Sequence, residues 1–182
     1  MSLAPPPRRI MIVGQPGSGK SRLAKEIGDV TGLPVIHIDR IHWQPGWVER
    51  TRAEKTRLCL EAGAGERWVF EGGHSRTWPS RLARADLLIW LDRSTSVRLW
   101  RVVRRSVTQH GRSRPDMADD CPERFRNLPG FLTYILTTAR SHRAATARLA
   151  ASAGCPVERL RSDEKAAALV ERLRLAFATQ SV

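Results

Sequence analysis

The sequence predicts an α/β fold, in which a parallel five-stranded sheet is covered by helices on both faces. Short apolar runs alternate with segments of helical spacing along almost the whole chain, and this order is typical of parallel strands joined by helical crossovers. A glycine-rich turn links the first apolar run to the first helical segment. The 182 residues fit a single domain, 1–182, with a small lid inserted at about 110–122.

Each predicted strand is a short run of apolar and β-branched residues. The clearest run, 86–92, is apolar almost throughout, as expected of a central strand that is buried on both faces. Asp39, Glu71 and Asp92 stand at or just after strand ends, and ligands of open parallel sheets bind beyond the carboxyl ends of the strands. The five predicted strands are 9–13, 34–38, 68–71, 86–92 and 156–160.

The helical segments carry recognisable capping residues. Gly32 is expected to end the first helix, while Ser94 or Thr95 and Ser162 are expected to cap the starts of two later ones. The predicted helices are 20–31, 52–62, 78–83, 95–109, 131–153 and 163–178. In 52–62 the expected buried residues are Leu58 and Leu60. In 95–109 apolar surface is expected from Val97, Leu99, Trp100, Val103 and Val107, with Arg98, Arg101 and Arg105 on another face.

The glycine-rich turn has the Walker A spacing, with two glycines separated by four residues and followed by Lys20 and Ser21. A strand, this turn and a helix N-terminus together place backbone N–H groups and the helix dipole around a phosphate. With all these parts present, a turn that binds nothing is disfavoured. The sequence therefore predicts a P-loop NTPase that binds ATP, with nucleotide contacts from Gly14, Gln15, Pro16, Gly17, Ser18, Gly19, Lys20, Ser21 and Arg22.

Two carboxylates are candidates for the chemistry beside the nucleotide. Ser21 and Glu71 are expected to hold Mg²⁺, and Lys20 to reach the β- and γ-phosphates. Asp39 is expected to accept a proton from an acceptor hydroxyl or to hydrogen-bond the substrate. The alternatives are an ordinary strand-end carboxylate for Glu71 and a capping role for Asp39. Asp92 is expected to be structural.

Aromatic and basic side chains complete the candidate site. Trp43 and Trp47 could stack on a ring-shaped substrate, although core packing is favoured for Trp47. His42 and His74 are weaker candidates for substrate contacts, and their spacing gives no metal pair. Stabilisation of the migrating charge is expected from arginines, with a solvated basic face as the alternative. These arginines are Arg101, Arg105, Arg112 and Arg114, of which the last two lie in the predicted lid.

The formal net charge of +13 raises the possibility of a nucleic-acid partner. The excess is almost all arginine, since the only lysines are Lys20, Lys25, Lys55 and Lys165, and the arginines are scattered along the chain. A dedicated nucleic-acid surface is therefore not favoured. No apolar run is long enough for a membrane span, so no membrane partner is expected. The three cysteines lack a CxxC spacing, which favours the cytoplasm.

Several stretches resemble one family, the adenylate-kinase-related P-loop proteins labelled DNA topology modulation protein, or FlaR-like. They are the glycine loop, 39–47, 68–72, Arg81 with Ala85 and Asp86, Leu91 with Asp92, and 112–123. The resemblance implies an adenylate/shikimate-kinase-like fold with ATP and Mg²⁺. It also implies that Arg101 lies against the adenine and Arg105 near the phosphates, with Asp39, Trp43 and Arg81 facing the acceptor. The chain departs from the family at 71–74 and at Arg93 and Ser94.

The favoured hypothesis is a phosphotransferase of the nucleotide-kinase type that uses ATP and Mg²⁺. It would act on a small, nucleotide-like acceptor that the sequence does not identify, with Trp43, His74 and Arg81 among its contacts. Two alternatives remain open. One is a nucleotide-dependent DNA-binding or topology-modulating regulator, and the other is a kinase of nucleic-acid 5′-hydroxyls.

Overall fold

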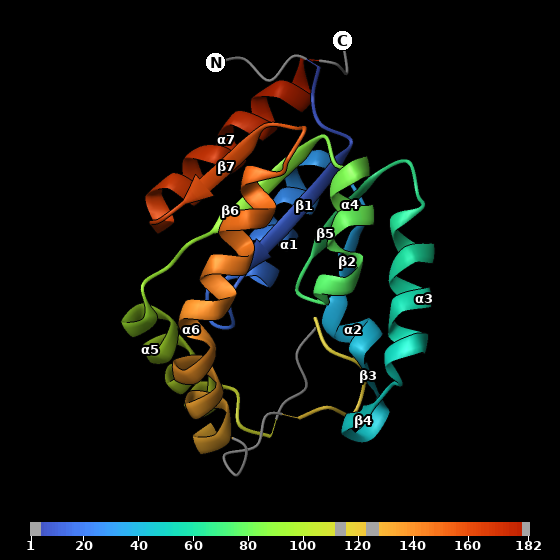
Figure 1. The fold of residues 1–182 in the computed structure, drawn as a ribbon. Helices are drawn as coiled ribbons and strands as arrows, with labels where there is room; N and C mark the ends of the chain where they lie inside the picture. Colours follow the sequence, from blue (N-terminus) through green and yellow to red (C-terminus); the bar gives the residue numbers. More distant parts are fainter. Residues whose placement is uncertain (1–4, 112–115, 123–127, 180–182) are drawn as a thin grey trace.

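A five-stranded parallel sheet forms the centre of the chain in the computed structural model, which describes residues 5–111, 116–122 and 128–179. Its strand order is β2-β5-β1-β6-β7, so the first strand lies in the middle (Figure 1). All five predicted strands are present, and the fold class is confirmed. Their bounds are β1 (Arg9–Gly14), β2 (Val35–His37), β5 (Trp68–Glu71), β6 (Leu87–Leu91) and β7 (Val157–Leu160).

Helices cover both faces of the sheet (Figure 1). Alternate residues of β1 enter opposite cores: Ile10 and Ile12 pack with α1 and α7, whereas Met11 and Val13 pack with α3, α4 and α6. This alternation buries the central strand on both sides. The helices are α1 (Lys20–Thr31), α3 (Arg52–Gly63), α4 (Trp78–Arg84), α5 (Thr95–Thr108), α6 (Leu128–Ala151) and α7 (Asp163–Ala178).

The capping predictions are confirmed at three helix ends. Gly32 ends α1 with a left-handed φ of 66°, and the hydroxyls of Ser94 and Ser162 accept backbone hydrogen bonds at the starts of α5 and α7. Helix α6 starts earlier than predicted. Pro129 and Gly130 fall in its first turn, where the missing N–H of a proline interrupts no helical bond.

Helix α5 is turned the opposite way from the prediction. Its apolar residues are exposed, namely Val97, Trp100, Val103 and Val107, while Val102 and Arg98 are buried. The Arg98 side chain, 1% exposed, donates hydrogen bonds to the Pro16 carbonyl and to the Thr95 hydroxyl. The side of α5 with basic residues therefore faces the glycine loop, because the loop offers carbonyl acceptors that an apolar side chain cannot use.

Residues between β2 and α3 are not a plain loop. Asp39 lies in the short helix α2 (Ile38–His42), so it does not follow the strand as an extended residue. The chain then forms a small antiparallel hairpin whose tip is a 3₁₀ turn. The hairpin strands are β3 (Trp43–Gln44) and β4 (Val48–Glu49).

The predicted lid is described only in part. Residues 112–115, which include Arg112 and Arg114, lie outside the described residues. The following segment packs against the β3–β4 hairpin: the Gly46 N–H donates to the Asp120 carbonyl at 3.0 Å, and Trp47 Nε1 donates to the Pro122 carbonyl at 3.1 Å. These two bonds hold residues 116–122 against the β3–β4 hairpin, and the Trp47 indole therefore has a hydrogen-bond partner in that segment.

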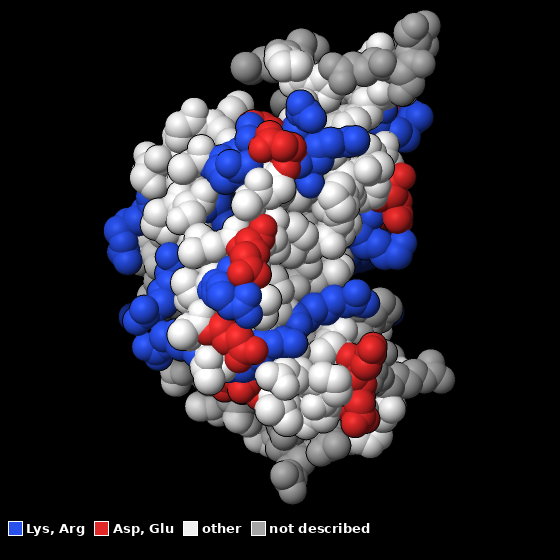
Figure 2. All heavy atoms as spheres, turned by 90° about the vertical axis from the view of Figure 1, so that its right-hand side faces the viewer, with Lys and Arg blue, Asp and Glu red and all other residues white. Residues whose placement is uncertain are grey.

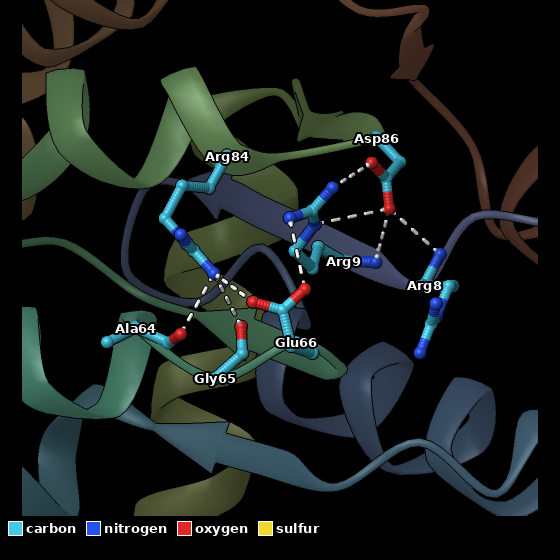
Figure 3. A network of polar contacts seen from close by, with 7 residues as sticks. All are labelled: Arg8, Arg9, Ala64, Gly65, Glu66, Arg84 and Asp86. Atoms are coloured by element: carbon cyan, nitrogen blue, oxygen red, sulfur yellow. Dashed lines mark hydrogen bonds and ion pairs between the residues drawn. The ribbon is translucent and has the colours of Figure 1, made fainter.

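A polar network closes the amino end of the sheet, opposite the glycine loop (Figure 3). The Asp86 carboxylate accepts hydrogen bonds from the backbone N–H groups of Arg8 and Arg9 and from the Arg9 guanidinium. Arg9 also lies 3.9 Å from Glu66, which pairs with Arg84. Burial alone raises the pKa of Asp86, but the hydrogen bonds from Arg9 and Arg8 outweigh it and hold the pKa below its usual range.

This shift gives a prediction for acid stability. Because the folded pKa of Asp86 is depressed, its contribution is present above the unfolded pKa of about 4 and is lost as pH falls through the folded value. Asp86→Asn is expected to lower the free energy of unfolding at pH 7 by about 1 kcal/mol. Urea unfolding of both proteins across acidic pH should show the difference shrinking. A difference that grows on acidification would contradict this assignment.

Candidate functional site

The glycine loop between β1 and α1 has the backbone that a phosphate site needs. Gly17 and Gly19 have φ values of 78° and 95°, a left-handed region that other residues rarely adopt. A Cβ on Gly17 would lie 2.6 Å from the Arg98 carbonyl oxygen, because α5 packs directly on the loop. The Lys20 ammonium reaches back across the loop and donates to the Gln15 carbonyl at 3.3 Å. The loop is thus closed and shaped by its glycines.

The atoms of this loop suit a triphosphate. Ser18 is 1% exposed, and its hydroxyl has no hydrogen-bond partner among the described residues. A buried hydroxyl without a partner is costly unless a ligand supplies one. Lys20 stands at the first position of α1, where the helix dipole favours an anion. The residues therefore fit a bound phosphate chain.

The predicted metal-side pair is brought together. The Ser21 hydroxyl donates to Glu71 Oε1 at 3.0 Å, and Glu71 is 2% exposed at the carboxyl end of β5. Among the described residues no group of three or more His, Cys, Asp or Glu side chains could hold a metal ion. Mg²⁺ commonly takes one or two carboxylates and completes its shell with phosphate oxygens and water. Ser21 and Glu71 fit that role only beside a nucleotide.

His37 is a neighbour of this pair that the sequence analysis missed. Its Nδ1 lies 2.9 Å from the same Glu71 oxygen that binds Ser21. Residues 37 and 71 are register partners in the β2–β5 pairing. The signal was present in the sequence, since His37 is the last but one residue of the predicted strand 34–38, and Glu71 ends the predicted strand 68–71. His37 and Ser21 therefore both hold Oε1 of the Glu71 carboxylate.

A second missed histidine comes from α6. His142 Nε2 lies 3.3 Å from the Tyr134 hydroxyl. Burial, followed by the charges of Arg98 and Lys20, lowers the pKa of His142, so α6 brings a neutral imidazole close to the glycine loop. Gln15 makes a direct link to the same helix, since its Nε2 donates to the Ala139 carbonyl at 2.6 Å. No local pattern predicts these contacts, because α6 is more than a hundred residues away in sequence.

Arg101, which is predicted to contact the nucleotide, lies on α5 beside the glycine loop. Its guanidinium donates to the Ser18 carbonyl at 3.1 Å and to Asp163 at 2.5 Å. Arg105 follows one turn later on α5 and is partly buried. Arg22, by contrast, has a side chain that is 83% exposed and pairs with Glu26 along α1. Arg101 therefore lies on the glycine loop, and its predicted contact with the adenine stays a prediction, whereas the Arg22 side chain points away from the loop.

The residues that the sequence analysis expects to contact an acceptor come from α2, the β3–β4 hairpin and the segment after β5. Trp43 is half-buried, and its ring centroid lies 4.9 Å from that of His42 and 5.2 Å from that of Trp47. His74 has a left-handed φ of 54°, and its Nε2 lies 2.9 Å from the Thr56 hydroxyl. Burial, and then the nearby cations Arg81 and Lys55, lower the pKa of His74. His74 is therefore neutral at pH 7.

Lys55 was not predicted as part of this cluster. Helix α3 buries Cys59 and Lys55, whereas the expected core residue Leu60 is 43% exposed. The Lys55 ammonium lies 2.6 Å from Glu49 and 3.5 Å from His42 Nε2. The buried Lys55 ammonium is thus paired with the Glu49 carboxylate and lies beside the His42 imidazole.

Arg81 does not face an acceptor as the resemblance implied. It is 1% exposed, and it donates to the carbonyl oxygens of Gly72, Gly73 and His74 while lying over the Phe70 ring. Burial lowers its pKa to about 10, so it stays charged at pH 7. Arg81 therefore fixes the backbone that follows Glu71 instead of binding a substrate.

Removing this side chain is expected to be costly. Arg81→Ala leaves a cavity and three carbonyl groups without their donor, so we expect a loss of about 3 kcal/mol in the free energy of unfolding. Arg84→Ala is the matched control on the same helix. Arg84 is partly exposed and binds two carbonyls and Glu66 (Figure 3), and its loss should cost less than about 1 kcal/mol. Equal losses in urea unfolding would contradict the buried role of Arg81.

Comparisons with known proteins show the fold. No family model matches the chain, and no curated protein matches it. Among solved structures it is similar to a shikimate kinase from Acinetobacter baumannii in complex with shikimate, with a TM-score of 0.55, 16% identity, and coverage of 96% of this chain and 95% of that one. For a deoxyadenosine kinase from M. mycoides with dCMP and dCDP bound, the values are 0.57, 14%, 96% and 100%.

A gluconokinase from Sinorhizobium meliloti 1021 gives a TM-score of 0.53 with 18% identity, over 96% of this chain and 93% of that chain. The chain therefore has the P-loop NTPase fold that its sequence predicts. The resemblance to the DNA topology modulation family gains no support from these comparisons. At such identities the likeness concerns the fold alone.

Proposed function

We propose that the chain is an ATP- and Mg²⁺-dependent phosphotransferase that acts on a small-molecule acceptor. The observation that carries the proposal is the closed glycine loop with its buried, unpartnered Ser18 hydroxyl beside the Ser21–Glu71 pair. Such a loop suits a phosphate chain, and the pair beside it suits a metal that shares the phosphate oxygens. A second substrate would bind beside the half-buried Trp43 and the imidazoles of His42 and His74.

The residues then have distinct tasks. The loop amides and Lys20 bind the phosphates, and Arg101 contacts the nucleoside end. Bound Mg²⁺ would offset charge on the β- and γ-phosphates through Ser21 and Glu71. Asp39 accepts the proton of the acceptor hydroxyl. Charge on the migrating group is stabilised by Lys20, with Arg105 as the nearest predicted addition and Arg114 as a candidate outside the described residues.

The metal assignment gives its own prediction. Glu71→Gln keeps the shape of the side chain but removes its charge, so we expect the Mg²⁺ concentration for half-maximal turnover to rise about tenfold or more. Glu66→Gln, at the opposite end of the sheet, removes the same charge and should leave that concentration unchanged. A Mg²⁺ titration of ADP release checks this. An unaltered dependence in Glu71→Gln would remove Glu71 from the metal site.

Nucleic-acid binding is the weaker candidate on structural grounds. On the side of the molecule that carries α3, Lys and Arg side chains are interspersed with Asp and Glu (Figure 2). On α3 itself, the exposed Arg57 pairs with Glu61 at 2.7 Å. A protein that binds nucleic acid is expected to have a continuous basic surface.

Among the described helices, none is long and apolar enough to cross a membrane.

The test of the proposal is ADP release from Mg-ATP over a panel of acceptors. The panel contains nucleoside monophosphates, deoxyadenosine, shikimate, sugar acids and an oligonucleotide with a free 5′-hydroxyl. Acceptor-dependent ADP release with a small molecule is the expected result. Release only with the oligonucleotide would replace the small-molecule acceptor by nucleic acid. Bound ATP without turnover on any acceptor would contradict the phosphotransferase assignment.

A further inference from the structure

A cavity of about 410 Å³ lies beside the glycine loop and is not used by the function proposed above. Its walls come from the loop residue Gln15, from α6 and from the segments that follow β6 and β7. Four arginines and one carboxylate line it: Arg93, Arg140, Arg143, Arg161 and Asp92. This volume is within the range that small-molecule sites occupy.

Asp92 cannot balance the charge of this cavity, because its oxygens are already occupied. Arg143 donates to both carboxylate oxygens, at 2.9 and 3.0 Å. Arg159 donates to Oδ2 from two nitrogens, at 3.0 and 2.5 Å, and lies over the Trp90 ring. One carboxylate that is 3% exposed thus serves two guanidinium groups completely. The remaining arginines have to find their partners elsewhere.

Two of those arginines have guanidinium N–H groups without an acceptor in the described part of the chain. Arg161 lies 3.8 Å from Asp92 Oδ2 and donates no hydrogen bond to the described part of the chain, and its side chain is 61% exposed. Arg140, one turn before Arg143 on α6, is exposed and makes neither an ion pair nor a hydrogen bond through its guanidinium within the described ranges. Both line the same cavity, so their charges add there.

A third donor is buried in the wall. The Arg93 side chain is 4% exposed, and although it binds Asp163 at 2.8 Å, its Nε has no hydrogen-bond partner. Asp163 also binds Arg101, so Arg93 joins the cavity to the nucleoside side of the loop. A buried guanidinium nitrogen without an acceptor is an expensive arrangement that an incoming oxygen would relieve.

We propose that this cavity binds a small organic anion with two or more negative charges, held by Arg140 and Arg161 at its mouth and by Arg93 in its wall. Bidentate guanidinium groups suit phosphate and carboxylate equally, so the ligand is a phosphorylated or a polycarboxylate metabolite. The site is separate from the Gly17–Ser21 amides. The proposal does not depend on phosphoryl transfer, because the arginines that would hold the anion have no part in the proposed reaction, although Gln15 of the glycine loop lines the cavity.

The experiment is a calorimetric titration of the full chain, without Mg²⁺ or ATP, using pyrophosphate and citrate as probes. The double variant Arg140→Ala/Arg161→Ala empties the mouth of the cavity but keeps the hydrogen bonds of Arg143 and Arg159 to Asp92. Arg52→Ala/Arg148→Ala removes the same charge from exposed positions outside the cavity and is the control. Lys20→Ala reports any binding of the probe to the glycine loop. Thermal unfolding of each variant confirms its fold.

Citrate or pyrophosphate is expected to bind the wild type and Lys20→Ala alike, and at least about tenfold more weakly to the cavity double variant. The control should stay within about twofold of the wild type. The better of the two probes identifies the carboxylate or the phosphate class.

Three results would overturn the proposal. Loss of all probe binding in Lys20→Ala would show that only the glycine loop is occupied. Equal weakening in the cavity and control variants would show general attraction to a basic protein. A single-stranded oligonucleotide that displaces the probe, and whose binding needs the same arginines, would assign the cavity to nucleic acid. The acceptor assay tests the proposed kinase activity and the titration tests the cavity, so the failure of one proposal can be distinguished from the failure of the other.

Discussion

Lys20→Ala is expected to lower kcat/KM for ATP by about a hundredfold to a thousandfold. An effect of this size is typical when an enzyme loses one preorganised charge or hydrogen-bond donor that stabilises the transition state. Lys20 stands at the first position of α1 and crosses the glycine loop to the Gln15 carbonyl. A ground-state contact to a carbonyl is easily exchanged for a phosphate oxygen. The measurement is ADP release with the acceptor that the panel identifies.

Lys25→Ala is the matched control for this variant. It removes a lysine from the same helix, where the side chain is 71% exposed and pairs with Asp29. Its kinetics should equal those of the wild type. If Lys20→Ala lost no more activity than Lys25→Ala, the ammonium would have no role in transfer, and the loop would have to act through its backbone alone.

Gly17→Ala is the second change with a large expected effect. The new Cβ would lie 2.6 Å from the Arg98 carbonyl oxygen on a backbone with φ of 78°, so the loop or α5 has to move. Displacing reacting groups by even about 1 Å can cost a hundredfold in rate, and we expect a fall of that size in kcat/KM. Strain at this position should also lower the free energy of unfolding by about 2 kcal/mol.

Gly130→Ala serves as its control, because nothing lies within 4 Å of a Cβ there and its φ is not in the left-handed region. It should change neither activity nor stability to a comparable degree. Thermal unfolding and steady-state kinetics of both variants are sufficient. Wild-type kinetics in Gly17→Ala would mean that the close packing of α5 on the loop does not shape the site.

The parts of this fold that local sequence determines were predicted well. Alternation of apolar runs and capped helices located all five parallel strands and the glycine loop, and the Ser21–Glu71 pair followed from the rule that ligand residues lie at the carboxyl ends of strands. These features depend on spacing and on residue type within a short window. Such signals can be read from the local sequence, without knowing which helices and strands pack together.

Helix α5 shows what a local pattern leaves open. Its periodicity separates apolar residues from arginines correctly, but it does not say which side turns inward. The inward side is the one with Arg98, because the Pro16 carbonyl and the Thr95 hydroxyl accept its hydrogen bonds. A buried arginine is favoured only when such acceptors are already in place. That condition is set by a loop some eighty residues earlier in the sequence.

The same reason explains Arg81, Lys55 and His142. Each is a polar side chain whose burial depends on how the surrounding elements pack, which a local sequence pattern does not show. Arg81 is a positioning residue for the backbone after Glu71, and the charges of Arg98 and Lys20 help to lower the pKa of His142 on the far helix α6. Sequence spacing can nominate such residues for a site, but only the folded chain shows whether they face a ligand or the protein itself.

The most direct measurement is an isothermal titration of the wild-type chain with Mg-ATP. The structure predicts saturable binding of one nucleotide per chain, which weakens sharply in Lys20→Ala. Absence of heat, or equal affinity in the two proteins, would contradict the claim that the loop between β1 and α1 holds a triphosphate.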